Sequence, residues 1–190
     1  MARDALSIDY ASHPQMRRTI DILRYCAESI SLEFDHWGER YARGPGLYFV
    51  IVSGHSVADF ADPMGDNRWP VDECAQVTDD IDSLLGAASE VALANDGAVI
   101  VGADGTVLEQ MVRLKDLGEA ERPTPEDVEQ IEYADWMGAR HMSAVDTSIR
   151  DEVIAAVTLS EESGRVTVFE AGNYDDTPRD RLGDPWRGDE

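Results

Sequence analysis

The chain has 190 residues, 43% of them hydrophobic, and its 39 acidic side chains outnumber its 16 lysines and arginines to give a net charge of −23. This size and hydrophobic content exclude a disordered chain and favour one folded domain, with two small domains as the alternative. There is no apolar run of about 18 residues and no apolar stretch near the first residue. We therefore expect a cytoplasmic protein without a membrane span or a secretory signal.

The acidic residues are spread along the whole chain, and Lys115 is the single lysine. A charge of one sign and this size repels itself in dilute buffer, and salt screens the repulsion, with a Debye length of about 3 Å at 1 M. The composition therefore predicts a protein adapted to a very salty cytoplasm. Basic residues are not clustered to neutralise phosphates, which argues against a nucleic-acid partner.

The first half of the chain predicts two helices around one strand. Apolar residues spaced three and four apart from Pro14 to Tyr41 predict an amphipathic helix, which residues 44–46 (Gly-Pro-Gly) end. Residues 47–54 (LYFVIVSG) predict a buried strand, and residues 55–70, which contain Gly, Pro, Asp and Asn, predict a loop. A second apolar stripe from Val71 to Val91 predicts another helix.

The second half predicts two hairpins. Residues 98–101 and 106–112 form the arms of the first, around a turn at residues 103–105 (Ala-Asp-Gly). Residues 152–160 and 165–171 form the arms of the second.

Two helices are predicted between these hairpins. One starts with Thr124 as N-cap and runs to about Trp136, and a short one lies near residues 140–149.

The polar residues 174–190 predict a flexible tail. Alternating helices and strands with hairpins predict a single α/β domain with a mixed β-sheet flanked by helices. Its parts are an N-terminal helical segment (1–43), a core (44–173) and the tail.

Three short segments contain residues suited to phosphate or metal chemistry. The first is residues 95–98 (Asn-Asp-Gly-Ala), at a predicted helix-to-strand junction. The carboxylate of Asp96 can hold a cation there, and Gly97 lets a ligand approach the backbone closely. The alternative is an ordinary Asp-Gly turn.

The second segment is residues 138–144, in which Gly138 precedes a helix start. Such a start leaves backbone N–H groups free for an anion, and Arg140 adds a planar fork for phosphate oxygens. The alternative is a surface arginine beside a packed histidine, His141.

The third segment is residues 160–164 (Ser-Glu-Glu-Ser-Gly). It is either a polar hairpin turn or a turn whose carboxylate completes a metal shell with Asp96.

In this order, DGAVIV, GARHMSA and SEESG resemble the three motifs of the diadenylate cyclase family, over about residues 40–172. The chain is similar to the stand-alone members from halophilic archaea. The resemblance implies a mixed sheet among helices and a nucleotidyltransferase. That enzyme condenses two ATP molecules into the second messenger cyclic di-AMP, releasing pyrophosphate, and depends on a divalent metal, Mn²⁺ or Mg²⁺.

The resemblance also implies site roles. Asp96, followed by Gly97 and Ala98, would help to activate the attacking 3′-hydroxyl through the metal. Arg140 and His141, with Gly138 before them, would bind the phosphates, and Ser160 would lie near the phosphates. Glu162 would bind the metal together with Asp96. Gly46 and Leu47 would lie beside the adenine.

Two residues depart from the family motifs. Met142 stands where the family has a third basic residue, so one phosphate contact is missing or supplied elsewhere. Asn95 stands where the family often has histidine, and its neutral amide can bind a hard cation only through oxygen.

Each chain has one set of motif residues, so we expect two protomers to associate with their active sites face to face, each holding one ATP. The alternatives are a metal-dependent phosphohydrolase using Asp96, His141 and Glu162, a non-catalytic nucleotide-binding module, and a salt-adapted structural protein.

Overall fold

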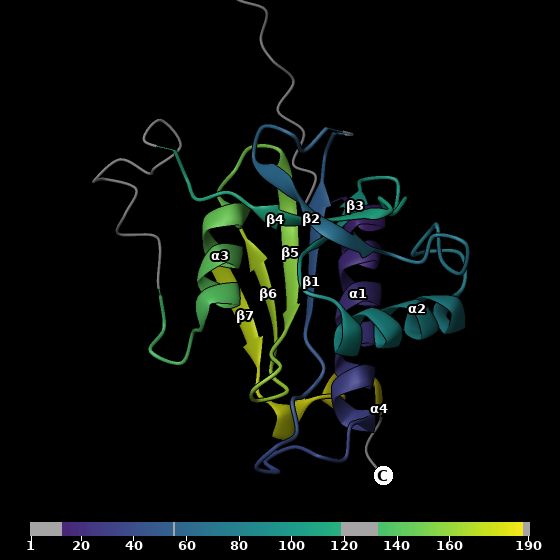
Figure 1. Cartoon of the computed structure of the whole chain (residues 1–190), viewed down its shortest axis with the longest axis vertical. Helices are drawn as coiled ribbons and strands as arrows, with labels where there is room; N and C mark the ends of the chain where they lie inside the picture. Colours follow the sequence, from purple (N-terminus) through teal and green to yellow (C-terminus); the bar gives the residue numbers. More distant parts are fainter. Residues whose placement is uncertain (1–12, 55, 119–132, 188–190) are drawn as a thin grey trace, which may run out of the picture.

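Strand β1 (Leu47–Val52) lies inside a five-stranded sheet with the order β3-β1-β5-β6-β7 (Figure 1). The other strands are β3 (Val99–Gly102), β5 (Val153–Leu159), β6 (Val166–Glu170) and β7 (Asn173–Thr177). β1 pairs parallel with β3 and antiparallel with β5, and β6 and β7 continue antiparallel, so the sheet is mixed. β1, β3 and β5 are buried along their whole length, which explains their continuously apolar sequences. The structure, a computed structural model, describes residues 13–54, 56–118 and 133–187.

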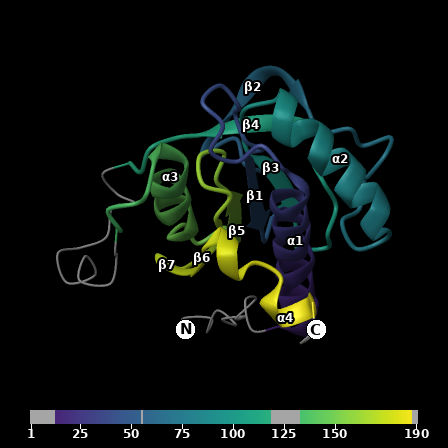
Figure 2. The same ribbon diagram turned by 90° about the horizontal axis from the view of Figure 1, so that it is seen from below.

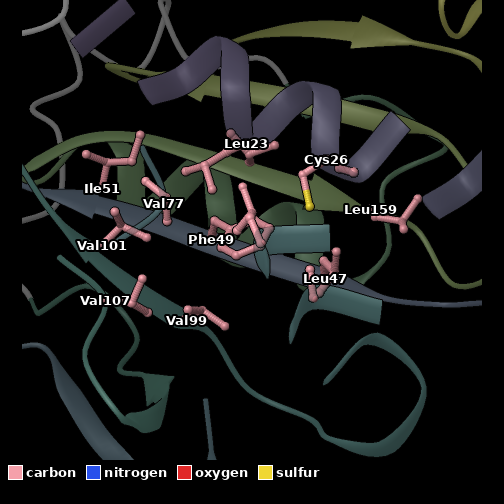
Figure 3. Close-up of a cluster of buried hydrophobic side chains, with 14 of the residues drawn as sticks. Leu23, Cys26, Leu47, Phe49, Ile51, Val77, Val99, Val101, Val107 and Leu159 are labelled. Carbon is pink, nitrogen blue, oxygen red and sulfur yellow. The ribbon is translucent and has the colours of Figure 1, made fainter. Parts of the chain in front are cut away.

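Helices cover both faces of this sheet. Helices α1 (Pro14–Glu33) and α2 (Ile81–Ala94) pack with Leu47, Phe49 and Ile51 in one core, whose side chains are drawn in Figure 3. The alternate residues of β1 face a second core that includes two residues of α3 (Ala139–Ser148). Figure 2 shows the sheet between α1 and α3. The predicted fold class is therefore confirmed: one α/β domain with a mixed sheet flanked by helices.

The first helix is shorter than predicted. It ends at Glu33, with Phe34 extended as its C-cap, rather than at Tyr41. The indole Nε1 of Trp37 donates a hydrogen bond of 2.9 Å to the carbonyl of Ser31, and its ring packs edge-on against Phe34. These aromatic residues continue the apolar spacing of the helix but fold back against its end.

The second predicted helix begins ten residues later than expected, at Ile81. The carboxylate of Asp80 accepts a hydrogen bond of 2.9 Å from the backbone N–H of Ser83 and so caps the helix. Val71, Cys74 and Val77 still pack in or against the core, but they do so from turns.

Residues 61–68 form strand β2 (Ala61–Arg68), so the predicted loop over 55–70 was partly wrong. β2 pairs antiparallel with β4 (Gln110–Leu114) in a separate two-stranded sheet. The first predicted hairpin is confirmed at its turn, where the N–H of Gly105 donates to the carbonyl of Gly102. Its second arm touches β3 only through isolated bridges and then pairs with β2.

The second predicted hairpin is confirmed as β5 and β6, and the short helix as α3. Most of the helix predicted from Thr124 lies outside the described residues, and residues 133–138 are coil and turn. The prediction of a flexible tail from residue 174 was wrong over residues 174–187. These form β7, a 3₁₀ turn (Arg179–Arg181) and a short helix α4 (Asp184–Arg187).

Glu28, in the middle of α1, is almost completely buried and binds this C-terminal segment. Its carboxylate pairs with Arg24 on one oxygen and accepts hydrogen bonds from the N–H of Gly183 and the indole of Trp186 on the other. Of the helices described, none is long and apolar enough to cross a membrane.

Candidate functional site

The three candidate segments meet in one cleft of about 390 Å³, where β5 ends, α3 begins and the chain enters β3. Nine of its twelve lining residues have polar or charged side chains: Arg43, Asp96, Arg140, His141, Ser160, Glu161, Glu162, Ser163 and Arg165, with Trp136, Gly138 and Ala139 as the others. The structure therefore brings together Asp96, Arg140, His141, Ser160 and Glu162, as the motifs led us to expect.

Asp96 stands at a sharp bend between α2 and β3. The N–H of Asn95 donates to Val91, closing α2, and Ala98 exchanges two backbone hydrogen bonds with Val112, of 2.7 and 3.0 Å. Gly97, between them, has φ +115, and a Cβ there would lie 3.1 Å from the carbonyl oxygen of Val112. Glycine is therefore required at this bend, which leaves the carboxylate of Asp96 half exposed in the cleft.

The turn between β5 and β6 presents the other carboxylates. Its ends are joined by the N–H of Ser160 donating to Arg165 and the N–H of Gly164 donating to Ser160, both at 2.9 Å. Gly164 has φ +68, which closes the turn. This geometry lets Glu161 and Glu162 reach the cleft together.

A cluster of four charged groups occupies the cleft. The Nη2 of Arg43 donates to Oδ1 of Asp96 at 3.0 Å and to Oε2 of Glu161 at 2.7 Å. The Nη2 of Arg140 lies near the same two oxygens, 3.4 Å from Oε2 of Glu161 and 4.0 Å from Oδ1 of Asp96. The hydrogen bond that Arg43 donates to Glu161 and the charge of that carboxylate, followed by the same two effects of Asp96, raise the pKa of Arg43 above its ordinary value. Two arginines and two carboxylates therefore neutralise one another.

Gly46 lies against this charged cluster, a position that its predicted role beside the adenine did not include. A Cβ at Gly46 would lie 2.5 Å from Nη1 of Arg140 and 3.1 Å from Glu161, so glycine makes room for the charged groups. Leu47, which was predicted beside the adenine, points instead into the core on the α1 side of the sheet (Figure 3).

His141 is buried in the cleft wall. Burial, and then the positive charges of Arg140 and Arg165, lower its pKa to about 4, so the imidazole is neutral at pH 7. Its Nε2 is buried and has no hydrogen-bond partner among the described residues. The ring packs edge-on against Trp136, with the ring centres 5.1 Å apart. The imidazole can therefore exchange a hydrogen bond with a ligand but does not add a positive charge.

Arg165 closes the same side of the cleft. Its guanidinium lies over the ring of Trp136, 4.3 Å from the ring centre, and pairs with Asp176 of β7. Arg43, Trp136, Glu161 and Arg165 were not among the site residues predicted from the sequence. The signal available for Arg43 was its position directly before the Gly-Pro-Gly segment.

A second, mostly apolar pocket of about 340 Å³ adjoins the charged cleft. The two share Ala139 and Arg140. Its other lining residues come from β1, the bend before β3, the β2–β4 ribbon and α3: Tyr48, Met64, Gly97, Ala98, Val112, Arg113, Leu114 and Ser143. A flat apolar group in this pocket would therefore lie next to a charged group in the cleft.

The described residues offer an incomplete metal shell. Asp96 and Glu162 line the same cleft. No group of three or more His, Cys, Asp or Glu side chains suited to a metal occurs within residues 13–54, 56–118 and 133–187. Mg²⁺ is commonly held by one or two carboxylates plus substrate phosphates and water. The donor set fits a cation that arrives with a phosphate ligand and does not fit a closed protein cage.

Comparison with known proteins finds likeness in structure alone: no family model matches the chain, and no curated protein does. A double mutant of DacA from Staphylococcus aureus matches with a TM-score of 0.51 and 16% identity, over 93% of this chain and 100% of that one. A hypothetical membrane-spanning protein from Bacillus cereus matches with a TM-score of 0.53 and 15% identity. These likenesses show the fold. The second covers 83% of this chain but 62% of that protein, less than two thirds of its length.

Proposed function

We propose that the chain is a diadenylate cyclase, a nucleotidyltransferase that joins two ATP molecules into cyclic di-AMP and releases two pyrophosphates. The observation that carries this proposal is the pairing of a charged cleft with an adjoining apolar pocket, joined at Ala139 and Arg140. A nucleotide has the same division between a flat base and a charged phosphate chain. The fold shared with DacA, a diadenylate cyclase, supports the same choice.

In this proposal the adenine lies in the apolar pocket and the triphosphate extends into the cleft. The phosphates lie at the start of α3, where Gly138 has no side-chain cap and the first backbone N–H groups of the ten-residue helix face the cleft end. Arg140 donates to phosphate oxygens from the first turn of the same helix. The neutral His141 lines the cleft beside Arg140 and adds no charge to it.

The reaction needs the 3′-hydroxyl of one ATP to attack the α-phosphate of the other. The new O3′–P bond forms as the bond from that phosphorus to the bridging oxygen breaks, and pyrophosphate leaves with the electron pair. Asp96, whose carboxylate is half exposed beside the cleft, orients the hydroxyl and takes up its proton as the O3′–P bond forms. A Mg²⁺ or Mn²⁺ ion held by Asp96 and Glu162 would ease ionisation of the hydroxyl and neutralise the triphosphate.

The second bond forms by the same exchange in the opposite direction, which closes the ring. One chain has one cleft with this set of groups among its described residues. A two-fold axis between two chains therefore supplies the required symmetry. Self-association with the clefts facing each other is part of the proposal.

The test is incubation of the pure protein with ATP in concentrated KCl, with Mg²⁺ or Mn²⁺, followed by mass spectrometry of the products. Cyclic di-AMP and pyrophosphate are the expected products. AMP or ADP would identify a phosphohydrolase instead. Binding of ATP without turnover under either metal would identify a nucleotide-binding module.

A further inference from the structure

We infer that Arg43 is a phosphate-binding residue of the nucleotide site, and that Asp96 and Glu161 compete with the phosphates for its guanidinium. This inference rests on the proposed function, because the nucleotide supplies the phosphates. It adds a residue that precedes β1 and lies outside all three motif segments.

The first support is the position of Arg43 relative to Arg140. The same two carboxylate oxygens, one from Asp96 and one from Glu161, lie within 3.0 Å of Arg43 and within 4.0 Å of Arg140. The two guanidinium groups therefore sit close together around one point. An anion in the cleft can contact both forks, as planar bidentate donors do with phosphate.

The second support is the charge balance of the molecule. In a chain with a net charge of −23, the cleft is lined by Arg43, Arg140 and Arg165. Arg165 is held elsewhere, between the ring of Trp136 and Asp176 of β7. Met142 is an exposed residue of α3 without charge, so the described cations that can approach a phosphate here are Arg43 and Arg140.

The third support is the way the backbone holds Arg43. The N–H of Gly44 donates to the carbonyl of Glu161 at 3.1 Å, and the N–H of Gly46 donates to Ala92 at 2.9 Å. These bonds fix the base of the Arg43 side chain, whose own exposed fraction is 66%. The guanidinium can therefore turn from the carboxylates to a ligand without movement of the chain.

Binding of a metal-bound nucleotide would replace the ion pairs between the arginines and the carboxylates. A divalent cation brought by the nucleotide competes for Asp96, while the phosphates compete for Arg43 and Arg140. Each ligand removes the partner that restrained the other, so binding of cation and phosphate reinforces itself. In the free protein the carboxylates weaken the affinity of both arginines for an anion.

The test measures binding of inorganic tripolyphosphate, ATP and adenosine by calorimetry, without metal and at one fixed KCl concentration. Arg43→Gln should weaken tripolyphosphate and ATP binding by roughly tenfold, the ratio expected for one lost charge-assisted contact, and leave adenosine unchanged. Arg40→Gln is the matched control: it removes the same charge from the same loop, but Arg40 lies outside the cleft lining, beside Tyr41. It should bind all three ligands as the parent does.

A second pair of variants tests whether Glu161 restrains Arg43, and here the affinity for tripolyphosphate should rise instead of fall. Glu161→Gln frees Arg43 and should tighten metal-free tripolyphosphate binding more than Glu162→Gln, which removes the same charge one residue away. In the Arg43→Gln background this excess should shrink to the part that comes from Arg140, which lies 3.4 Å from Glu161.

The outcomes separate this inference from the function. Unchanged tripolyphosphate affinity in Arg43→Gln, or an equal loss in Arg40→Gln, would overturn the role of Arg43 and leave the cyclase proposal standing. A parent protein that binds neither ATP nor tripolyphosphate would overturn both.

Discussion

The indole Nε1 of Trp186 donates a hydrogen bond of 2.9 Å to Oε2 of Glu28, across 158 positions of the sequence. A carboxylate buried in the middle of a helix is stable only when its oxygens are paired. Glu28 meets this requirement through Arg24, Gly183 and Trp186. The segment that contains Gly183 and Trp186 is therefore part of the folded domain.

Replacing Trp186 by Phe should destabilise the protein, because it removes one donor from a buried charge. We expect a loss of about 1–3 kcal/mol in the free energy of unfolding, measured by denaturant titration in concentrated KCl. Tyr41→Phe, a change at a side chain that is 91% exposed, is the control and should have almost no effect. Equal stability of Trp186→Phe and the parent would show that the contact contributes nothing.

Asp96→Asn should lower cyclic di-AMP formation by roughly a hundredfold or more, because an amide cannot accept the hydroxyl proton or hold a cation as a carboxylate does. Its thermal midpoint should stay near that of the parent, since the side chain is half exposed. Asp151→Asn makes the same change in the exposed turn before β5, at the opposite end of that strand, and should keep full activity. An active Asp96→Asn enzyme would remove Asp96 from the mechanism.

His141 should titrate near pH 4 when followed by the chemical shifts of its ring protons. Its folded pKa lies below the ordinary 6.5, so as the pH falls from about 6.5 to 4 the unfolded chain takes up the proton first. The stability associated with the neutral ring is lost across that window. His36 is an internal comparison: its hydrogen bond with Glu39 raises its pKa, so it should titrate above 6.5. A midpoint for His141 at or above that of His36 would contradict the burial argument.

The thermal midpoint should rise with KCl concentration, because screening relieves repulsion among 39 acidic side chains. Each kcal/mol of relief corresponds to about 2–4 °C for a chain of this size. NaCl at equal ionic strength should act alike, since the effect depends on screening and not on a bound ion. A midpoint that is flat or falls with salt would refute the salt-adaptation hypothesis.

Specific activity at saturating ATP should fall when the protein is diluted, because the proposed reaction needs two chains with their clefts facing each other. A covalently cross-linked pair should keep its activity at the same dilution. Turnover by a protein shown to be monomeric, with constant specific activity, would count against the face-to-face model and the cyclase proposal together.

The sequence predicted those elements whose local pattern is strong. The β5–β6 hairpin and α3 were found because apolar runs and glycine turns mark them. β2 was missed because it pairs only with β4 and exposes alternate residues, among them Pro63 and Gly65, which are typical of loops. The end of α1 was misplaced because Phe34 and Trp37 continue the helical spacing while packing back on the helix.

The candidate site was predictable only where its residues belong to short motifs. Asp96, Arg140 and Glu162 each lie in such a motif. Arg43 is 53 positions from Asp96 and 118 from Glu161, and its partners are set by the parallel pairing of β1 with β3 and the antiparallel pairing of β1 with β5. A contact of that kind comes from tertiary structure, and the neighbouring Gly-Pro-Gly segment does not reveal the partners of Arg43.

The ring of Trp37 has a consequence for how related sequences can vary. A Cβ at Gly44 would lie 2.2 Å from this ring, and one at Gly164 would lie 2.9 Å from it. The loop that contains Arg43 and the turn that contains Glu161 therefore both pack against the indole of Trp37. Any lineage that keeps Trp37 must therefore keep both glycines. Gly164 is needed in any case, because its φ is +68 and a Cβ there would also lie 2.7 Å from the hydroxyl of Ser31. A tryptophan at position 37 should therefore occur together with glycine at positions 44 and 164, although position 164 lies far away along the chain.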